Sequence, residues 1–263
     1  MSKTILLTGA TDGIGLETAK LLIADGHRLL AHGRNAGKLD ALKETLAEGP
    51  GTVETYQADL SNLQETDRLA AEVAAAHDHL DVIINNAGVF RTPSEVTADG
   101  HDVRFVVNTI APYMLTRRLL DRMDKSGRIV NLSSAAQSPV SLEALAGQKR
   151  LEAMEAYSQS KLAITIWSQD LARELGSDGP AVIAVNPGSL LASKMVRDGF
   201  GVAGSDLGIG ARVLVDAALG DRFAGASGQY FDNDSGAFAN PHPFAMDAKQ
   251  AAGVMQTLDA LLP

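Results

Sequence analysis

The sequence predicts a single α/β domain, a doubly wound parallel sheet of about seven strands flanked by helices. Short β-branched or aliphatic runs alternate with longer amphipathic segments along the whole chain, which is typical of βα units around a parallel sheet. The chain has 263 residues, 45% of them hydrophobic, which is enough to bury one large core. No repeat or linker divides it before about Pro187, so we expect one domain spanning residues 1–263.

The expected strands are recognised by their β-branched and aliphatic residues. Six are clear and the last is weaker, and they span residues 4–8, 28–32, 52–57, 80–85, 127–133, 181–186 and 228–231. Leu22 and Ile23 share a helix face after the first strand, and Gly26 is expected to cap that helix. Later helices are indicated by Leu69 and Val73 and, near the C-terminus, by the spacing within residues 246–262.

The composition of the chain changes after Pro187. Residues 188–227 are rich in Gly, Ala and Ser and have weak periodicity. This predicts a mobile substrate loop at about 189–227, with short helices rather than another core layer. The lid itself is expected to begin within residues 191–200.

Composition and charge exclude several classes of function. Without cysteine there is no disulfide framework, thiolate metal site or cysteine nucleophile. A net charge of −9 without a Lys/Arg-rich run speaks against nucleic acid as a partner. With no apolar stretch long enough for a membrane span and no signal region, we expect a cytoplasmic protein. His77 and His79 are read as a solvated helix end, and no metal site is predicted.

A glycine-rich loop joins the first strand to the first helix. It reads Thr8-Gly9-Ala10-Thr11-Asp12-Gly13-Ile14-Gly15, and helical spacing follows at once. Glycines let the backbone turn tightly and approach a pyrophosphate without a Cβ in the way, while the helix N-terminus offers unpaired N–H groups. In this context we predict a dinucleotide site rather than a merely flexible turn.

The loop resembles the Thr-Gly-x-x-x-Gly-x-Gly loop of the short-chain dehydrogenases/reductases. Further motifs follow in that family's order up to about residue 190: Asn85-Asn86-Ala87-Gly88, Asn108, Ser133-Ser134, Tyr157-Ser158-Gln159-Ser160-Lys161 and Asn186-Pro187-Gly188. The interval of 23 residues from Ser134 to Tyr157 is longer than in most members and is similar to the retinol-dehydrogenase-like branch. The resemblance implies a Rossmann-like fold and an NAD(P)-dependent oxidoreductase that interconverts an alcohol and a ketone or aldehyde. A non-catalytic dinucleotide-binding sensor is the alternative, but it needs neither Tyr157 nor Lys161.

The end of the second strand is where the choice between NADP and NAD is expected. A carboxylate about 20 residues beyond the loop would bind the ribose hydroxyls of NAD. The chain instead reads His32-Gly33-Arg34-Asn35, and the Arg34 guanidinium is suited to a 2′-phosphate. Asp12 opposes this reading because its carboxylate could repel that phosphate. We favour NADP(H) over NAD(H), with an NAD-dependent enzyme and a merely solvated Arg34 as alternatives.

The resemblance implies further cofactor contacts. Asp59 and Leu60 would contact the adenine, although Asp59 is also suited to a helix N-cap that Ser61 or Asn62 could share. Pro187 and its neighbours would place backbone groups against the nicotinamide carboxamide. The expected cofactor-binding set is Gly9, Thr11, Asp12, Gly13, Ile14, Arg34, Asp59, Leu60, Asn86, Ala87, Gly88, Tyr157, Lys161, Pro187, Gly188 and Leu190.

The expected catalytic residues are Asn108, Ser134, Tyr157 and Lys161. Tyr157 and Lys161 are four residues apart in a helical segment and should project from one face. A free tyrosine has a pKa near ~10, and an adjacent ammonium favours its ionised form. The resemblance implies that Tyr157 is the acid in carbonyl reduction and the base in alcohol oxidation, while Lys161 also binds the nicotinamide ribose.

Ser134 and Asn108 complete this set. Ser134 would bond the substrate oxygen. The resemblance favours it over Ser133, because the second serine of such a pair is the usual counterpart in the family, and neighbouring strand residues should point in opposite directions. Asn108 would hold a water that links Lys161 to solvent, or would simply bond backbone within a helix.

Only a few residues indicate the class of substrate and the oligomeric state. The apolar substrate wall is expected to include Val89, Phe90, Leu190, Leu191 and Met195. Trp167 is expected in the core or in a subunit contact, and the helix that carries it is used for dimerisation in many relatives. We therefore predict a homodimer or homotetramer that acts on a small, largely apolar alcohol or carbonyl compound.

Overall fold

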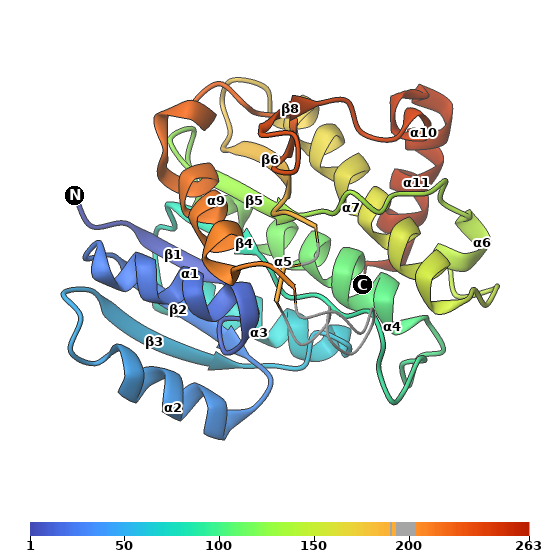
Figure 1. Ribbon diagram of the computed structural model, residues 1–263. Coiled ribbons are helices and arrows are strands. Elements are labelled where there is room, and N and C mark those ends of the chain that lie inside the picture. The colour runs from blue at the N-terminus through green and yellow to red at the C-terminus, as the bar shows by residue number, and fades with distance from the viewer. Residues whose placement is uncertain (190, 193–203, 263) are drawn as a thin grey trace.

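One eight-stranded sheet organises the chain (Figure 1). The computed structural model describes residues 1–189, 191–192 and 204–262. Strand order is β3-β2-β1-β4-β5-β6-β7-β8, and all pairs are parallel except the antiparallel pair of β7 and β8. The strands are β1 (Thr4–Leu7), β2 (Arg28–Gly33), β3 (Thr52–Gln57), β4 (Val82–Asn85), β5 (Arg128–Leu132), β6 (Ala181–Asn186), β7 (Tyr230–Asp232) and β8 (Ala237–Ala239). The predicted doubly wound parallel sheet is confirmed, with β8 as an addition.

Both faces of the sheet are buried. Ile5 and Leu7 belong to the core cluster on one face, whereas Leu6 between them belongs to the cluster on the other. All three side chains have no exposed surface. Successive side chains of a strand point to opposite faces of the sheet. Because both faces are buried, the sequence of β1 is continuously apolar rather than alternating.

Helices cover the two faces as separate layers (Figure 1). Leu22, Leu42 and Leu214 place α1, α2 and α9 in one core cluster. Leu69, Leu115 and Trp167 place α3, α5 and α7 in the other. The longer helices are α1 (Gly13–Ala24), α2 (Ala36–Leu46), α3 (Leu63–Ala76), α5 (Ala111–Leu119), α7 (Ala153–Leu175), α9 (Leu207–Leu219) and α11 (Ala248–Leu261). The shorter ones are α4 (Val103–Phe105), η1 (Val106–Ile110), η2 (Leu120–Arg122), α6 (Leu142–Leu145), η3 (Asp221–Phe223) and α10 (Pro243–Met246).

Helix α9 corrects a sequence prediction. The prediction that 188–227 adds no further core layer is wrong for α9, which packs against α1 and the sheet and buries Leu214 and Ala217 completely. Small residues weaken the hydrophobic periodicity here because they serve close packing. A Cβ on Gly210 would lie 3.3 Å from the Ile14 side chain on α1. Most of the predicted lid, residues 190 and 193–203, lies outside the described residues.

The C-terminal helix α11 packs on α7 and α6. Leu258 of α11 is fully buried in the same core cluster as Trp167. The Tyr113 hydroxyl of α5 donates a hydrogen bond to Asp259 at 2.6 Å. Trp167 is itself completely buried, so the core position is confirmed for it. Part of the α7 surface is thus covered by the same chain.

His77 also departs from its prediction. Its ring is buried rather than solvated and forms a 2.8 Å hydrogen bond with the Tyr56 hydroxyl. Within the described residues, no group of three His, Asp or Glu side chains is placed to hold a metal ion. No helix in the described part of the chain has the length and hydropathy to cross a membrane.

Candidate active site

The candidate site lies at the carboxyl edge of the sheet, where loops leave β1, β4, β5 and β6. Gly9, Asn86, Ser134 and Pro187 each follow within two residues of the end of one of these four neighbouring strands. Parallel strands bring their carboxyl ends to one edge, so four loops far apart in the sequence converge there.

The glycine loop after β1 turns sharply into α1. Gly9 and Gly13 have φ of +67° and +54°, which favours glycine. A Cβ on Gly15 would lie 2.0 Å from the Gly9 carbonyl oxygen, so this close approach also requires glycine. Asp12 caps α1 by accepting a hydrogen bond from the Gly13 amide. The resulting concave backbone beside a helix N-terminus fits a pyrophosphate group.

The loop after β4 holds the glycine loop in place. The Thr8 hydroxyl accepts hydrogen bonds from the amides of Asn86 and Ala87, each at 3.0 Å. The Asn86 side chain donates to the carbonyls of Thr8 at 2.9 Å and Gly9 at 3.1 Å. Thr8 was absent from the predicted set, although it is the first residue of the recognised motif.

The end of β2 carries an exposed cation. The Arg34 side chain makes no ion pair with any residue that the structure describes, so its guanidinium is available to a ligand. Lys38, which the sequence reasoning missed, forms a 2.7 Å ion pair with Asp12. The Asp12 carboxylate, expected to oppose a 2′-phosphate, is therefore paired with a cation.

The turn after β3 excludes one of the two readings of Asp59, that of a helix cap. Its Oδ1 atom accepts hydrogen bonds from the amide and hydroxyl of Ser61, at 2.9 and 2.8 Å. Helix α3 is capped instead by Asn62, whose side chain accepts from Gln64 and Glu65. Asp59 is thus not the helix cap, and Leu60 beside it is buried.

Gly88 lies between the glycine loop and the expected catalytic residues. A Cβ there would lie 3.4 Å from Asn108 Oδ1 and 3.5 Å from Lys161 Nζ. Lys161 is almost fully buried, and its ammonium donates a 2.7 Å hydrogen bond to the Leu132 carbonyl at the end of β5. Burial lowers the pKa of Lys161 to about 8.

Tyr157 lies beside Lys161 on α7. The Lys161 ammonium is 5.8 Å from the centre of the Tyr157 ring, so the two side chains share one side of the helix as expected. Burial raises the pKa of Tyr157, and a hydrogen bond with Ser134 partly opposes that rise. The expectation of a lowered pKa is therefore wrong for this structure, because desolvation of the phenolate is the largest effect.

The two adjacent serines have different surroundings. The Ser133 hydroxyl donates to the Lys161 carbonyl at 3.0 Å and lies 2.6 Å from the Thr165 hydroxyl, so it fastens α7 to β5. Ser134 instead interacts with the Tyr157 side chain and opposes the rise of its pKa. The choice of Ser134 over Ser133 for the substrate oxygen stays a prediction.

Two residues missing from the predicted set hold Ser134. The Gln137 amide and the Tyr230 hydroxyl both donate to the Ser134 carbonyl, at 3.0 and 3.1 Å. Tyr230 belongs to β7, so only the packing of the sheet reveals its contact with a residue nearly a hundred positions earlier.

Asn108 lies in the π-helix η1. Its side chain accepts from the Val89 amide at 2.8 Å and donates to the Val89 carbonyl and the Ser160 hydroxyl, at 3.0 and 2.9 Å. Pro112, four residues later, has no amide hydrogen, so the Asn108 carbonyl cannot accept the i+4 hydrogen bond of an α-helix. The side chain thus bonds backbone, as in the alternative reading, and π-helical turns are frequent at functional sites.

The turn between β7 and β8 holds the loop after β6. Asn233 donates to the Pro187 carbonyl at 3.0 Å, and Asp234 accepts from the Ser189 amide at 2.8 Å. Gly188 has φ of +124°, which other residues rarely adopt. Leu190, also expected at the cofactor, lies outside the described residues.

The expected apolar wall is partly visible. Phe90 is buried, and its ring centre lies 5.2 Å from that of Tyr157. Leu191 is also buried, while Met195 is outside the described residues. Aromatic and aliphatic groups beside the expected proton donor favour an apolar substrate.

The lowered pKa of Lys161 predicts how stability changes with pH. Between pH 8 and 9.5 the unfolded chain keeps this proton while the folded protein releases it, so the free energy of unfolding should rise with pH. We expect a rise of roughly 1–2 kcal/mol relative to Lys161→Met, measured by urea unfolding of both proteins. Parallel pH profiles for the two proteins would show that Lys161 does not carry this effect.

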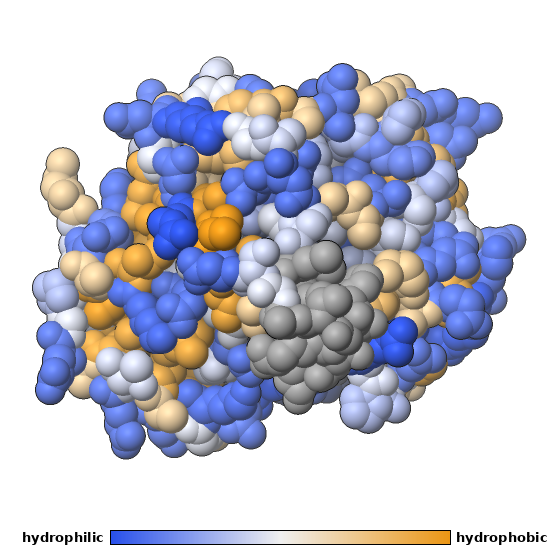
Figure 2. Space-filling model, in the orientation of Figure 1, coloured by the Kyte–Doolittle hydropathy of each residue, from blue (hydrophilic) through white to orange (hydrophobic). Residues whose placement is uncertain are grey.

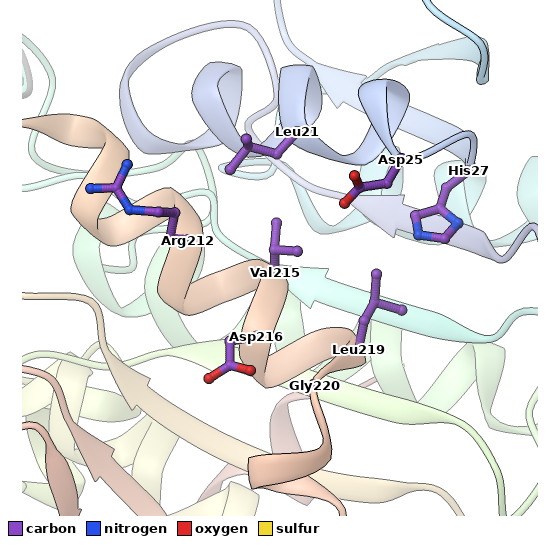
Figure 3. Close-up of a pocket in the computed structure, with 8 residues that line it drawn as sticks. All are labelled: Leu21, Asp25, His27, Arg212, Val215, Asp216, Leu219 and Gly220. Carbon is purple, nitrogen blue, oxygen red and sulfur yellow. The ribbon is translucent and has the colours of Figure 1, made fainter.

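A separate groove of about 540 Å³ lies between α1 and α9. Leu21, Val215 and Leu219 face it, with Asp25 and His27 at one end (Figure 3). Apolar surface also shows on this side of the molecule (Figure 2). The α1 residues of the groove are at the opposite end of that helix from the glycine loop, so it does not belong to the candidate site.

Comparisons with known proteins agree with this arrangement. The family model described as short chain dehydrogenase matches residues 3–200. Human retinol dehydrogenase 13 is 32% identical over 254 residues, which cover 88% of this chain and 76% of that protein.

Solved structures show the same fold. A putative uncharacterized protein from Mycobacterium paratuberculosis has a TM-score of 0.82 at 28% identity, covering 98% of this chain and 92% of that one. A short chain dehydrogenase from Burkholderia cenocepacia J2315, in complex with NADP, has a TM-score of 0.72 at 27% identity, covering 88% and 95%. The chain therefore belongs to the short-chain dehydrogenase/reductase family, near its retinol-dehydrogenase branch, and is an NAD(P)-dependent oxidoreductase.

Proposed function

We propose that this protein is an NADP(H)-dependent oxidoreductase that interconverts an alcohol and a ketone or aldehyde, with Tyr157 as the acid and base. The observation that carries the proposal is the contact series from the glycine loop through Gly88 to Lys161, Tyr157 and Ser134. This series supports a dinucleotide cradle next to a proton donor.

The proposed chemistry divides between cofactor and protein. The nicotinamide cofactor would supply or accept the hydride. Tyr157, kept protonated by its raised pKa, would donate its phenolic proton to the carbonyl oxygen during reduction. Ser134 would hydrogen-bond the same oxygen and stabilise its developing charge. Lys161 would hold the nicotinamide ribose and keep a positive charge near Tyr157.

A proton path to solvent is proposed at Asn108. Its carbonyl lacks the amide donor of an α-helix because Pro112 occupies the position four residues later. That carbonyl would accept a hydrogen bond from a water next to Lys161, whose Nζ lies on the same side of Gly88 as the Asn108 side chain. In the proton relay predicted from the sequence, the water would then be held by the main-chain carbonyl of Asn108 rather than by its side chain.

The preference for NADP(H) is supported by local charge. Arg34 is exposed and without an ion pair among the described residues, Lys38 pairs with Asp12, and the end of β2 has no carboxylate. A planar guanidinium binds phosphate oxygens through two parallel hydrogen bonds. These residues would hold the 2′-phosphate that distinguishes NADP from NAD.

The substrate proposed is a small, largely apolar carbonyl compound or alcohol. Phe90 and Leu191 support this class, and retinol dehydrogenase 13 carries the name of one such alcohol. The test is NADPH oxidation, followed at 340 nm, against apolar aldehydes including retinal, ketones, steroids and quinones, with NADH in parallel. We expect turnover of at least one apolar carbonyl with NADPH and at least tenfold lower kcat/KM with NADH. Turnover with NADH alone would contradict the cofactor assignment.

Three expectations from the sequence stay predictions. One is a substrate loop in the part of 189–227 that precedes α9, most of which lies outside the described residues. Self-association as a homodimer or homotetramer and a cytoplasmic location also stay predictions.

A further inference from the structure

A buried histidine connects three segments that surround the proposed dinucleotide site. His32 lies near the end of β2, two residues before Arg34, and is 3% exposed. Its Nδ1 atom lies 3.3 Å from the Gly9 amide nitrogen, and its Nε2 atom lies 3.0 Å from the Ala58 carbonyl oxygen. The ring therefore spans from the glycine loop after β1 to the turn after β3.

These two contacts fix one tautomer of His32. The Ala58 carbonyl can only accept a hydrogen bond, so Nε2 must carry the proton. The Gly9 amide can only donate, so Nδ1 must be the acceptor. Burial lowers the pKa of His32 to about 4, so the ring is neutral at neutral pH and keeps both bonds.

The position of His32 matches that of Asn86 on the other side of the loop. Asn86 bonds the Gly9 carbonyl from β4, and His32 bonds the Gly9 amide from β2. Strands β2 and β4 are the two neighbours of β1. Gly9 has a φ of +67°, and a glycine in a flexible loop could adopt many other conformations. Here hydrogen bonds hold both its amide and its carbonyl.

We propose that His32 is a positioning residue that fixes the Gly9 peptide, and with it the glycine loop, in the conformation that receives the cofactor's phosphates. This inference rests on the function proposed above. In it, the Ala58 bond sets the tautomer and the Gly9 bond positions the loop. His32 touches neither substrate nor reacting atoms, so it acts on cofactor binding rather than on the chemical step.

Two substitutions separate the two bonds. His32→Asn places an amide oxygen where Nδ1 was and keeps the acceptor for Gly9, but loses the donor to Ala58. His32→Gln places an amide nitrogen where Nε2 was and keeps the donor to Ala58, but loses the acceptor for Gly9. Each variant loses one hydrogen bond of the same buried side chain, so the two should have similar melting temperatures.

The first measurement is amide exchange of Gly9 in the protein without cofactor. We expect exchange about tenfold faster in His32→Gln and within about threefold of wild type in His32→Asn, because only the first frees the amide. Exchange in β5 serves as an internal reference for intact folding. Equal acceleration in both variants, or none in His32→Gln, would overturn the proposal.

The second measurement is the dissociation constant for NADPH, read from its fluorescence. We expect it to rise about tenfold in His32→Gln and less than about threefold in His32→Asn, with kcat at saturating NADPH changed less than about twofold in both. A fall in kcat with unchanged NADPH binding would contradict a positioning role. If the wild-type protein binds neither NADPH nor NADH, the proposed function fails, while the exchange result still decides whether His32 holds the loop.

Discussion

Tyr157→Phe is expected to lower kcat for carbonyl reduction by about 10³-fold, because the substitution removes the only proton that the proposed mechanism delivers to the substrate oxygen. The ring itself should stay in place, since its contact with Phe90 does not use the hydroxyl. The NADPH dissociation constant should change less than about threefold. The measurement is kcat on the best carbonyl of the substrate panel, together with NADPH fluorescence titration.

The matched control is Tyr56→Phe. The Tyr56 hydroxyl bonds His77 at the C-terminal end of α3, away from the candidate site. Removing this hydroxyl should lower the stability of the protein but leave kcat at the wild-type level. Tyr157→Phe with more than about a tenth of wild-type kcat would remove Tyr157 from its role as the acid. Equal losses in the two variants would point to a general defect in folding.

Arg34→Ala is expected to raise the KM for NADPH by about 30-fold and the KM for NADH by less than about twofold. The physical reason is the loss of charge-assisted hydrogen bonds to the 2′-phosphate, worth about 2 kcal/mol, in a group that NADH does not have. Arg34 has no ion pair among the described residues, so its removal leaves no buried carboxylate unpaired. Steady-state kinetics with each cofactor provide the measurement.

Two further variants sharpen the Arg34 test. Arg34→Lys keeps the charge but loses the planar fork, and we expect it to recover only part of the NADPH affinity. Lys38→Ala leaves the Asp12 carboxylate without its 2.7 Å partner, so it should weaken NADPH more than NADH through repulsion. Changes of the same size for both cofactors in Arg34→Ala would sink the assignment of the phosphate site.

Local spacing predicted the features that depend on neighbouring residues. Tyr157 and Lys161 share one side of α7 because side chains four apart lie on successive turns. The glycine loop turns into α1 where the sequence indicated, because Gly9 and Gly13 can adopt positive φ. Helix α9 and strand β8 were not predicted, because segments that are short or made of small residues give a weak periodic signal.

Contacts between distant segments were beyond local spacing. His32 gives no sign in the sequence of its bond to Gly9, and Tyr230 gives none of its bond to the Ser134 carbonyl. Both contacts depend on the order of the strands in the sheet: β2 is the neighbour of β1, and β7 lies two strands from β5.

The sequence by itself determined the fold class, the family resemblance and the chemistry of the expected site, because residue type, strand period and helix spacing are local properties. Only the tertiary structure decided the pKa values in the site and the long-range contacts that hold its loops. The pKa of Tyr157 is raised rather than lowered because burial is set by the whole fold, and Asp12 is paired with Lys38 because α2 packs near the glycine loop. Desolvation and long-range pairing are properties of the packed chain.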